Sequence, residues 1–217
     1  MRKLRFCLIL LALAVLAGAL FTAFRPPPEP VYDGQRLSQW ILDAVQLPRP
    51  PDLKEIHHVD ARAIPYLLKW IRYETPPWKN NLFGAINPVL RRFTPNWLLT
   101  DQKEQLRADA AMLALIALGP DATAAIGPLS ATLTNPKTFR SAVRSANVLE
   151  ALGKAGLPGL LPGLTNQKGV VRTYVASRIG ELGPEARSAV PVLHELCKDP
   201  DPAVRYAATN ALEKIDH

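Results

Sequence analysis

The sequence from Gln105 to His217 repeats itself, and this repetition constrains the fold more than any other feature. Four segments share one twelve-residue pattern, and they occupy residues 107–118, 141–152, 171–182 and 204–215. Successive copies start 34, 30 and 33 residues apart. Apolar residues within a copy recur at spacings of four and three, which places them on one face of a helix. A period of about 30 to 35 residues is typical of helix pairs stacked in an α-solenoid.

Superposing the copies brings the residues expected in the core into register. They are Ala111, Leu115 and Leu118, then Ser145, Leu149 and Leu152, then Val175, Ile179 and Leu182, and finally Ala208, Leu212 and Ile215. Leu-Gly closes the first three copies, at Gly119, Gly153 and Gly183. Glycine there can take the left-handed conformation that ends a helix. Pro120 and Pro184 follow, and they prevent the helix from continuing.

A second helix is expected after each turn, in segments 123–133 and 186–196. The equivalent residues 156–164 read GLPGLLPGL, and their glycines and prolines predict a short or irregular element. Residues 37–73 show the helical spacing more loosely, with Pro65 in the first turn of a helix. We interpret them as a divergent first helix pair that caps the stack.

The stretch of residues 74–100 is the least regular part of the chain. It predicts one helix near residues 82–93, bent or broken at Pro88. Asp101 and Glu104 then resemble a capping box, which begins the first clear repeat.

Two stretches resemble HEAT repeats, of the short class also found in phycobilin lyases: VVRTYVASRIGELGPEARSAVPVLHEL (170–196) and DPDPAVRYAATNALEKI (199–215). The shared features are the D-P-x-V-R entry, the small alanine positions and the A-V-P-x-L second helix. The resemblance covers residues 105–217 well and 37–73 loosely. It implies an all-α fold, a right-handed α-α solenoid, and no particular function, because such repeats are scaffolds with varied partners. The leader, with YDGQRLSQWI and AIPYLLKWIRYETPPW, is also similar to exported HEAT-repeat proteins of bacteria of the Verrucomicrobia–Planctomycetes type.

The leader has the features of a membrane helix. Three basic residues near the start precede residues 6–24, a run of 19 residues without charge. A helix of that length spans roughly 28 Å, close to the hydrocarbon thickness of a bilayer. The preceding positive charge places the N-terminus in the cytoplasm and the body outside. Cleavage after Ala19 as a signal peptide is one possibility, giving a periplasmic or secreted protein, but we favour an anchor because the apolar run continues beyond that point.

These features divide the chain into four parts. They are a signal anchor or signal peptide at 1–24, a proline-rich spacer at 25–36, a divergent helix pair with an irregular aromatic-rich segment at 37–100, and HEAT-like repeats at 101–217.

The charge distribution argues against a nucleic-acid partner. The chain carries a formal charge of +7, but three of its basic residues belong to the leader, which leaves 23 Lys and Arg against 19 Asp and Glu. This excess is mild and spread out, with no basic run beyond Arg91-Arg92. Only the pI of about 9.6 supports nucleic-acid binding, and export opposes it.

Arginines recur near the start of three copies. Arg172 and Arg205 share a position, and Arg144 lies nearby in the second copy. In the HEAT resemblance such an arginine pairs with an aspartate at the repeat entry, here Asp199 or Asp201. We favour this structural ladder over phosphate binding.

Other reactive side chains suggest neither a metal site nor a catalytic one. His57 and His58 could share an ion, but no third ligand follows at a motif spacing, so no metal is expected. Cys197 has His194 one helical turn away, yet its apolar neighbours favour a packing role. The sequence contains no phosphate loop, nucleophile elbow or paired-carboxylate site, so we expect no cofactor and no enzymatic activity.

Aromatic side chains are concentrated between residues 70 and 97. One interpretation is a satellite core that pins a long loop to the stack. The other is a binding surface, because tryptophan and arginine are favoured in binding hot spots. On that second interpretation Trp78, with the neighbouring Arg91 and Arg92, is the first candidate for binding a partner.

The leading functional hypothesis is a non-enzymatic interaction module on the outer face of the cytoplasmic membrane. Its groove, lined by the second helices, would bind another protein or a peptide. A bilin-lyase-like enzyme is the second hypothesis, and it rests on the repeat class alone. A nucleic-acid-binding solenoid is the third.

Overall fold

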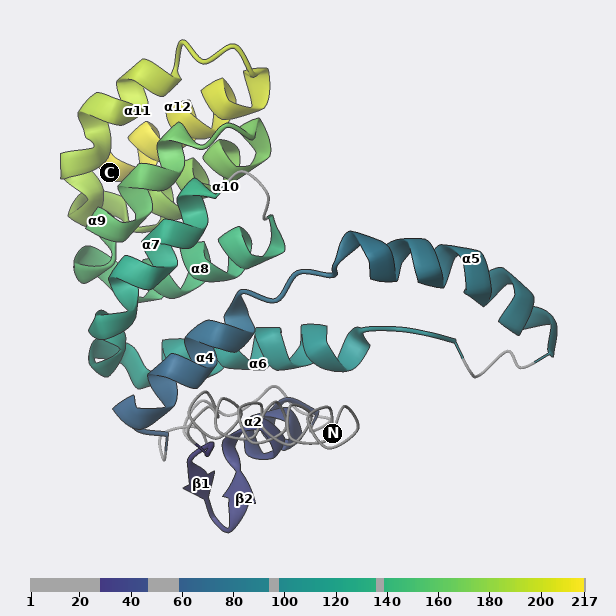
Figure 1. Ribbon diagram of the computed structural model, residues 1–217. Helices are drawn as coiled ribbons and strands as arrows, with labels where there is room; N and C mark the ends of the chain where they lie inside the picture. The colour runs from purple at the N-terminus through teal and green to yellow at the C-terminus, as the bar shows by residue number, and fades with distance from the viewer. Residues whose placement is uncertain (1–27, 47–58, 94–97, 136–138, 217) are drawn as a thin grey trace, which may run out of the picture.

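The computed structural model describes residues 28–46, 59–93, 98–135 and 139–216, and it is helical almost throughout (Figure 1). The α-helices are α2 (Leu37–Gln46), α4 (Ile64–Ile71), α5 (Pro77–Phe93), α6 (Gln102–Leu118), α7 (Ile126–Thr134), α8 (Arg140–Ala151), α9 (Leu157–Leu160), α10 (Gly169–Glu181), α11 (Val190–Leu196) and α12 (Pro202–Asp216). The 3₁₀ helices are η1 (Ala61–Ala63), η2 (Gly119–Ala125), η3 (Gly153–Ala155), η4 (Leu161–Thr165) and η5 (Gly183–Ala189). In these ranges the only strands are β1 (Val31–Tyr32) and β2 (Gln35–Arg36), which pair as an antiparallel hairpin. The expected all-α class is confirmed.

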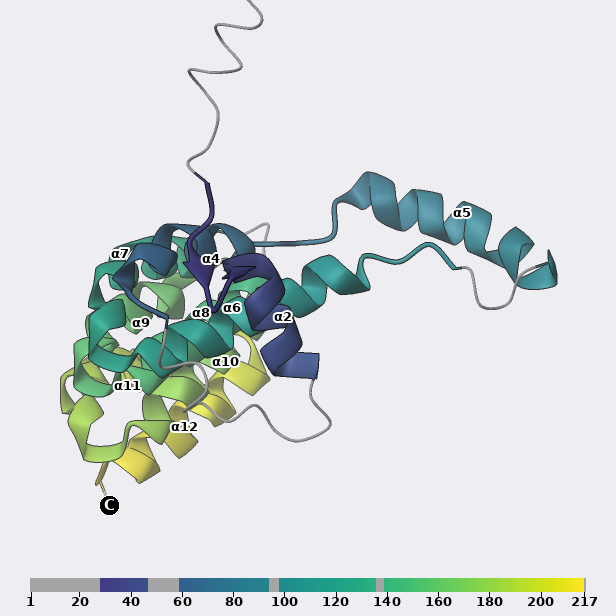
Figure 2. The same cartoon turned by 90° about the horizontal axis from the view of Figure 1, so that it is seen from below.

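Helices α6, α8, α10 and α12 form at the four copies of the repeated segment, and each packs against the next in chain order. The second helices α7, α9 and α11 lie together on one side of this row in both views (Figures 1 and 2). Helices α4 and α2 pack on α6, at the N-terminal end of the row. The chain is therefore an array of helical repeats.

The residues that the repeat aligns form the core of the array. Leu149, Ile179 and Ile215 are completely buried. Leu182 and Leu212 pack against the same core but stay partly exposed. Leu182 is the residue that caps α10, so it lies past the last full turn of the helix. The predicted register is correct, but these two positions reach the rim of the core rather than its centre.

The first three repeats each reverse direction at a glycine with a positive φ angle, of +53° at Gly119, +59° at Gly153 and +56° at Gly183. Residues with a Cβ avoid these angles, so the glycine turns expected from the sequence are confirmed. Within the described residues, one stretch, Gln102–Thr134, is long and apolar enough to cross a membrane by length and composition. The reversal at Gly119 divides it into α6 and α7, which pack within the array, and core helices pass the same test.

The second helix of the second repeat is short, as its glycines and prolines predict. Helix α9 has only four residues, and η4 continues it. A Cβ added at Gly159 would lie 2.7 Å from Leu149 Cδ2, and one at Gly163 would lie 2.9 Å from Val175 Cγ2. These distances are too short for ordinary packing, so glycine allows the segment to lie close against α8 and α10.

The residues before α2 are folded against the body. Stretch 25–36 is predicted as a spacer, yet from Pro28 onward it makes defined contacts. Tyr66 OH donates a hydrogen bond to the Pro28 carbonyl (3.0 Å), and the Leu37 N–H donates to the Pro30 carbonyl (2.9 Å). Only residues 25–27 separate the apolar run from this folded part.

A hairpin that the helical patterns did not predict joins β1 to β2. Its two turn residues, Asp33 and Gly34, have φ angles of +49° and +78°. An Asp-Gly pair is the sequence signal for such a two-residue turn. The leader at residues 1–24 and the pair His57-His58 lie outside the described residues.

Helices α10 and α12 approach so closely that a Cβ added at Gly180 would lie 2.8 Å from Ala211 Cα. We expect Gly180→Ala to lower the free energy of unfolding by about 1–3 kcal/mol, because overpacking forces the helices apart. Gly127→Ala is the matched control, since nothing lies within 4 Å of a Cβ there and alanine favours helix. Urea denaturation measures both variants, and equal stabilities would contradict the close crossing.

Candidate functional site

The segment between α4 and α6 forms an arm, which comprises the described residues 74–93 and 98–101. Helix α5 runs away from the stack in both views (Figures 1 and 2). It begins at Pro77, earlier than the expected start at residue 82, and it is continuous through Pro88. No described side chain of α5 is buried, so the satellite-core interpretation is wrong for this helix.

One face of α5 is apolar and exposed. We call its residues the apolar stripe: Trp78, Leu82, Ile86, Val89 and Phe93. At about 100° per residue these positions fall within an arc of roughly 80°. Trp78 and Phe93, at the two ends, are 62% and 79% exposed. Contiguous apolar surface of this kind marks a site of interaction with another molecule.

The three residues predicted to bind a partner all lie on the arm, but not in one place. Trp78 lies in the first turn of α5, whereas Arg91 and Arg92 lie in its last turn. About 13 residues at 1.5 Å each separate them by roughly 20 Å. By helical position Arg92 borders the apolar stripe, and Arg91 lies on the opposite face. The structure thus does not bring Trp78 to the two arginines.

The returning chain is held against the middle of α5 by Asn87. Its Nδ2 donates to the Leu99 carbonyl (3.0 Å), and the Leu99 N–H donates to Asn87 Oδ1 (2.9 Å). One side-chain amide thereby satisfies both backbone groups of Leu99, as a neighbouring strand would. The arm is a helix braced by a second segment.

Polar side chains join the two ends of the arm at its root. The Asp101 carboxylate accepts hydrogen bonds from Thr75 Oγ1, Tyr73 OH (3.2 Å) and Gln105 Nε2 (3.3 Å). Burial alone would raise the pKa of Asp101, but these donors outweigh burial and lower it. Asp101 makes no side-chain capping bond, so the predicted capping box with Glu104 does not form.

Arg144 anchors this root to the repeats. Its side chain is almost completely buried, and its guanidinium donates to the Tyr73 carbonyl (3.0 Å), Gln105 Oε1 (2.7 Å) and Asp109 Oδ1 (2.6 Å). Arg144 lies near the ladder arginines by repeat position, but it connects α8 to α6 and to the root of the arm. A buried charge needs such partners, so the root is a fixed part of the stack.

Replacing Asp101 should loosen the arm while the repeats stay folded. We expect Asp101→Ala to speed amide hydrogen exchange in residues 98–105 by about tenfold, because hydrogen bonds worth roughly 1.4 kcal/mol are lost locally. Glu104→Ala is the matched control, since its ion pair with Lys79 spans 3.6 Å and both side chains stay partly exposed. Hydrogen–deuterium exchange mass spectrometry separates the two variants. Identical exchange in both would rule out this role for Asp101.

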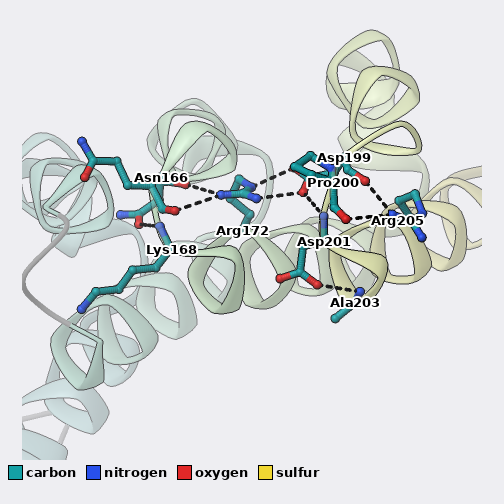
Figure 3. Close-up of polar contacts among 9 residues, drawn as sticks. Asn166, Lys168, Arg172, Asp199, Pro200, Asp201, Ala203 and Arg205 are labelled. Atoms are coloured by element: carbon teal, nitrogen blue, oxygen red, sulfur yellow. Dashed lines mark hydrogen bonds and ion pairs between the residues drawn. The ribbon is translucent and has the colours of Figure 1, made fainter.

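The predicted pairing of an arginine with an entry aspartate is confirmed for Arg172 (Figure 3). Its Nε and Nη2 donate to the two carboxylate oxygens of Asp199, at 2.9 and 2.8 Å. Both side chains are nearly buried. The guanidinium beside Asp199 lowers the pKa of that carboxyl, although burial opposes the shift. All three guanidinium nitrogens donate to protein groups, which supports a structural role rather than phosphate binding.

Arg205, in the next repeat, binds the backbone carbonyls of the turn before its own helix (Figure 3). Its Nη1 donates to the carbonyls of Asp199 (2.8 Å) and Pro200 (3.1 Å). Arg172 Nη1 donates in the same way to the Asn166 carbonyl (2.7 Å). Each arginine therefore closes the turn that precedes its own helix.

Asn166 takes the place of Asp199 one repeat earlier. Each side chain accepts a bond from the N–H two residues on, with Lys168 N at 2.8 Å from Asn166 Oδ1 and Asp201 N at 2.9 Å from Asp199 Oδ1. The amide Nδ2 of Asn166 also donates to the Leu133 carbonyl (2.6 Å). An uncharged amide suits a backbone carbonyl, whereas the carboxylate at the next entry suits a guanidinium.

The Arg172–Asp199 pair makes stability depend on pH. Because the folded pKa of Asp199 lies below the unfolded value of about 3.9, its contribution is present above about pH 4 and is lost as pH falls through the folded pKa. We expect Arg172→Ala to lower the free energy of unfolding by about 1.5–3 kcal/mol at pH 7, and by less in acid. Denaturant titrations across pH measure this. Lys198→Ala, which removes an exposed pair with Glu195, should change little, and a pH-independent Arg172→Ala deficit would contradict the linkage.

Two of the three second helices present an uncharged surface. Helix α7 and the α9–η4 segment contain no Asp, Glu, Lys or Arg, and they pack against each other. The exposed residues of this second-helix surface include Gly127, Ala131, Pro158 and Thr165. The first helices α8 and α10 carry charged residues, such as Arg140 and Glu181. The first two repeats therefore have a neutral side, whereas α11 of the third repeat carries the exposed Glu195.

A cavity of about 190 Å³ lies at the root of the arm. It is lined by Lys69, Trp70, Arg72, Tyr73, Glu104 and Arg107. The Arg107 guanidinium lies 5.8 Å from the centre of the Trp70 ring, a cation–π contact. The volume of this cavity is below the roughly 300–1,000 Å³ of typical small-molecule sites.

The remaining sequence candidates are separate from the arm. Cys197 is partly buried, with its sulfur 3.8 Å from Thr209 Oγ1, and the His194 side chain is exposed. Within the ranges that the structure describes, no group of three or more His, Cys, Asp or Glu residues is placed to hold a metal ion.

Comparison with known proteins gives one match. Residues 157–217 match the family described as HEAT repeats. No curated protein and no solved structure matches the chain. The matched residues are those of α9 to α12, which contain the Arg172–Asp199 pair. The match and the helical repeats together support a HEAT-repeat protein, a helical scaffold of the kind that mediates protein interactions.

Proposed function

We propose that this chain is an exported bacterial scaffold that residues 6–24 anchor in the cytoplasmic membrane. It binds another protein or a peptide and catalyses no reaction. Its helix pairs continue as a right-handed α-α solenoid, which presents an extended surface to the partner. The match to HEAT repeats and the resemblance to exported HEAT-repeat proteins support this proposal.

The observation that carries the proposal is the neutral second-helix surface. Helix α7 and the α9–η4 segment expose small and apolar residues without a charge among them. Protein interfaces are depleted of charge at their centres, because an unpaired charge is costly to remove from water. The first helices, with their charged residues, form the side that stays in solvent.

The composition of the leader and its distance to the body support the proposed anchoring. Residues 6–24 carry no charge and are long enough to span a bilayer. Only four peptide units separate Phe24 from Pro28, where the folded body begins. A chain of that length reaches about 14 Å at most, so the body lies close to the membrane surface.

Site-specific photo-crosslinking in cells tests the partner site. A benzoylphenylalanine replacing Ala131, on the second-helix surface, should give a discrete crosslinked protein. Lys103, exposed on α6, is the matched control position and should give none. A Thr165→Glu change should reduce the Ala131 crosslink by about tenfold or more without lowering Tm, because it places an unpaired charge in the interface. Equal crosslinking from both positions, or no effect of Thr165→Glu, would refute the site.

A further inference from the structure

We propose that the arm is a membrane-binding element, and that the apolar stripe of α5 lies in the interface of an anionic bilayer. This inference rests on the proposed anchoring, because it assigns the stripe to the bilayer that holds residues 6–24. The arm is then a second attachment to the membrane. It lies in the surface of the bilayer, whereas residues 6–24 cross it. Charge, side-chain type and distance each support it.

The charge of the arm complements an anionic surface. Between Glu74 and Asp101 the sequence contains no acidic residue, whereas it contains Lys79, Arg91 and Arg92. Arg92 is exposed and borders the apolar stripe. Each basic side chain near an anionic membrane surface contributes to attraction, and the two carboxylates of the arm, Glu74 and Asp101, lie at its root rather than on α5.

The apolar side chains suit the boundary between headgroups and acyl chains. Helices that lie in this boundary bury large apolar residues on one face and keep basic residues beside them. Trp78 and Phe93 stand at the two ends of the stripe, and aromatic rings favour this depth in a bilayer. A helix of 17 residues presents roughly 25 Å of length to the surface. A protein partner would need a matching groove with acidic rims, whereas the bilayer supplies both properties directly.

Distances within the body place the root of the arm near the proposed anchor. Pro28 lies within about 14 Å of Phe24 along the chain. Tyr66 of α4 contacts Pro28 directly, through its hydrogen bond of 3.0 Å. From Tyr66 to Tyr73, at the root, is about 10 Å along the helix. The root clamped by Arg144 and Asp101 therefore holds α5 within reach of the same membrane surface.

Depth-sensitive fluorescence on the full chain tests the inference. Cys7→Ser and Cys197→Ser leave no other thiol, since the chain has two cysteines. A nitrobenzoxadiazole label is then attached at Ile86→Cys, on the stripe, or at Asn80→Cys, which lies on the opposite face of α5. Each protein is reconstituted into vesicles of equal parts phosphatidylglycerol and phosphatidylcholine that contain doxyl-labelled lipid.

We expect the label at residue 86 to be quenched by the lipid and the label at residue 80 to stay in water. Arg92→Gln should weaken docking of the arm by about fivefold, since one basic residue is worth about that factor at an anionic surface. Arg91→Gln, on the face away from the bilayer, is the matched control and should weaken it less. Vesicles of phosphatidylcholine alone should give less quenching at residue 86.

Three results would overturn the inference. Equal quenching at residues 80 and 86 would show that the stripe does not face lipid. Shielding of residue 86 that rises with protein concentration in detergent would assign the stripe to a second copy of the chain. Shielding only after native extract is added would assign it to a protein partner.

A separate measurement keeps this inference distinct from the proposed anchoring. Carbonate extraction of native membranes releases peripheral proteins but retains a spanning helix. Retention of the protein together with an unquenched label at residue 86 would refute the role of the arm but not the anchoring. Release of the full-length protein would refute the anchor, and with it the basis for the arm.

Discussion

Close approach of neighbouring helices determines the geometry of the array. At the crossing of α10 and α12, Gly180 lies against Ala211, and Ala176 and Ala208 are completely buried. Small side chains bring the two backbones together and so maximise dispersion contacts in a close-packed interior. This close approach determines the offset between neighbouring repeats. The offset in turn determines the position of the turn before each first helix. The meeting of one helix's arginine with the next turn's aspartate depends on that offset.

Buried guanidinium groups serve two different purposes in this molecule. Arg172 closes an entry turn and pairs with the aspartate of the following turn. Arg144 has instead become the anchor of the arm, with Tyr73 and Gln105 as its partners. Removing a charge from water is costly, so such groups persist where several acceptors surround them. These arginines mainly fix the positions of the segments that they join. A projecting helix with an exposed apolar face requires such a fixed root.

The repeat period predicted most of the array because its signals are local. Helical spacing, the glycines at the turns and the short GLPGLLPGL segment act within one repeat, so α6 to α12 could be placed before any contact was known. The arm could not be placed in this way. Its root depends on contacts between residues about 70 positions apart, such as the Ser141 N–H with Glu74 Oε1 at 2.7 Å. A repeat period carries no information about such a pairing, and the aromatic residues alone left open whether residues 70–97 form a satellite core or a binding surface.

The sequence alone determined the helical class, the length of the repeat and the turn positions. These follow from short-range rules, namely the period of the helix and the conformational freedom of glycine. Only the tertiary structure decided that α5 leaves the stack, that Trp78 and Arg92 lie at opposite ends of one helix, and that Asp101 binds the root rather than capping α6. Those outcomes depend on which distant groups compete for the same hydrogen-bond donors and the same buried space.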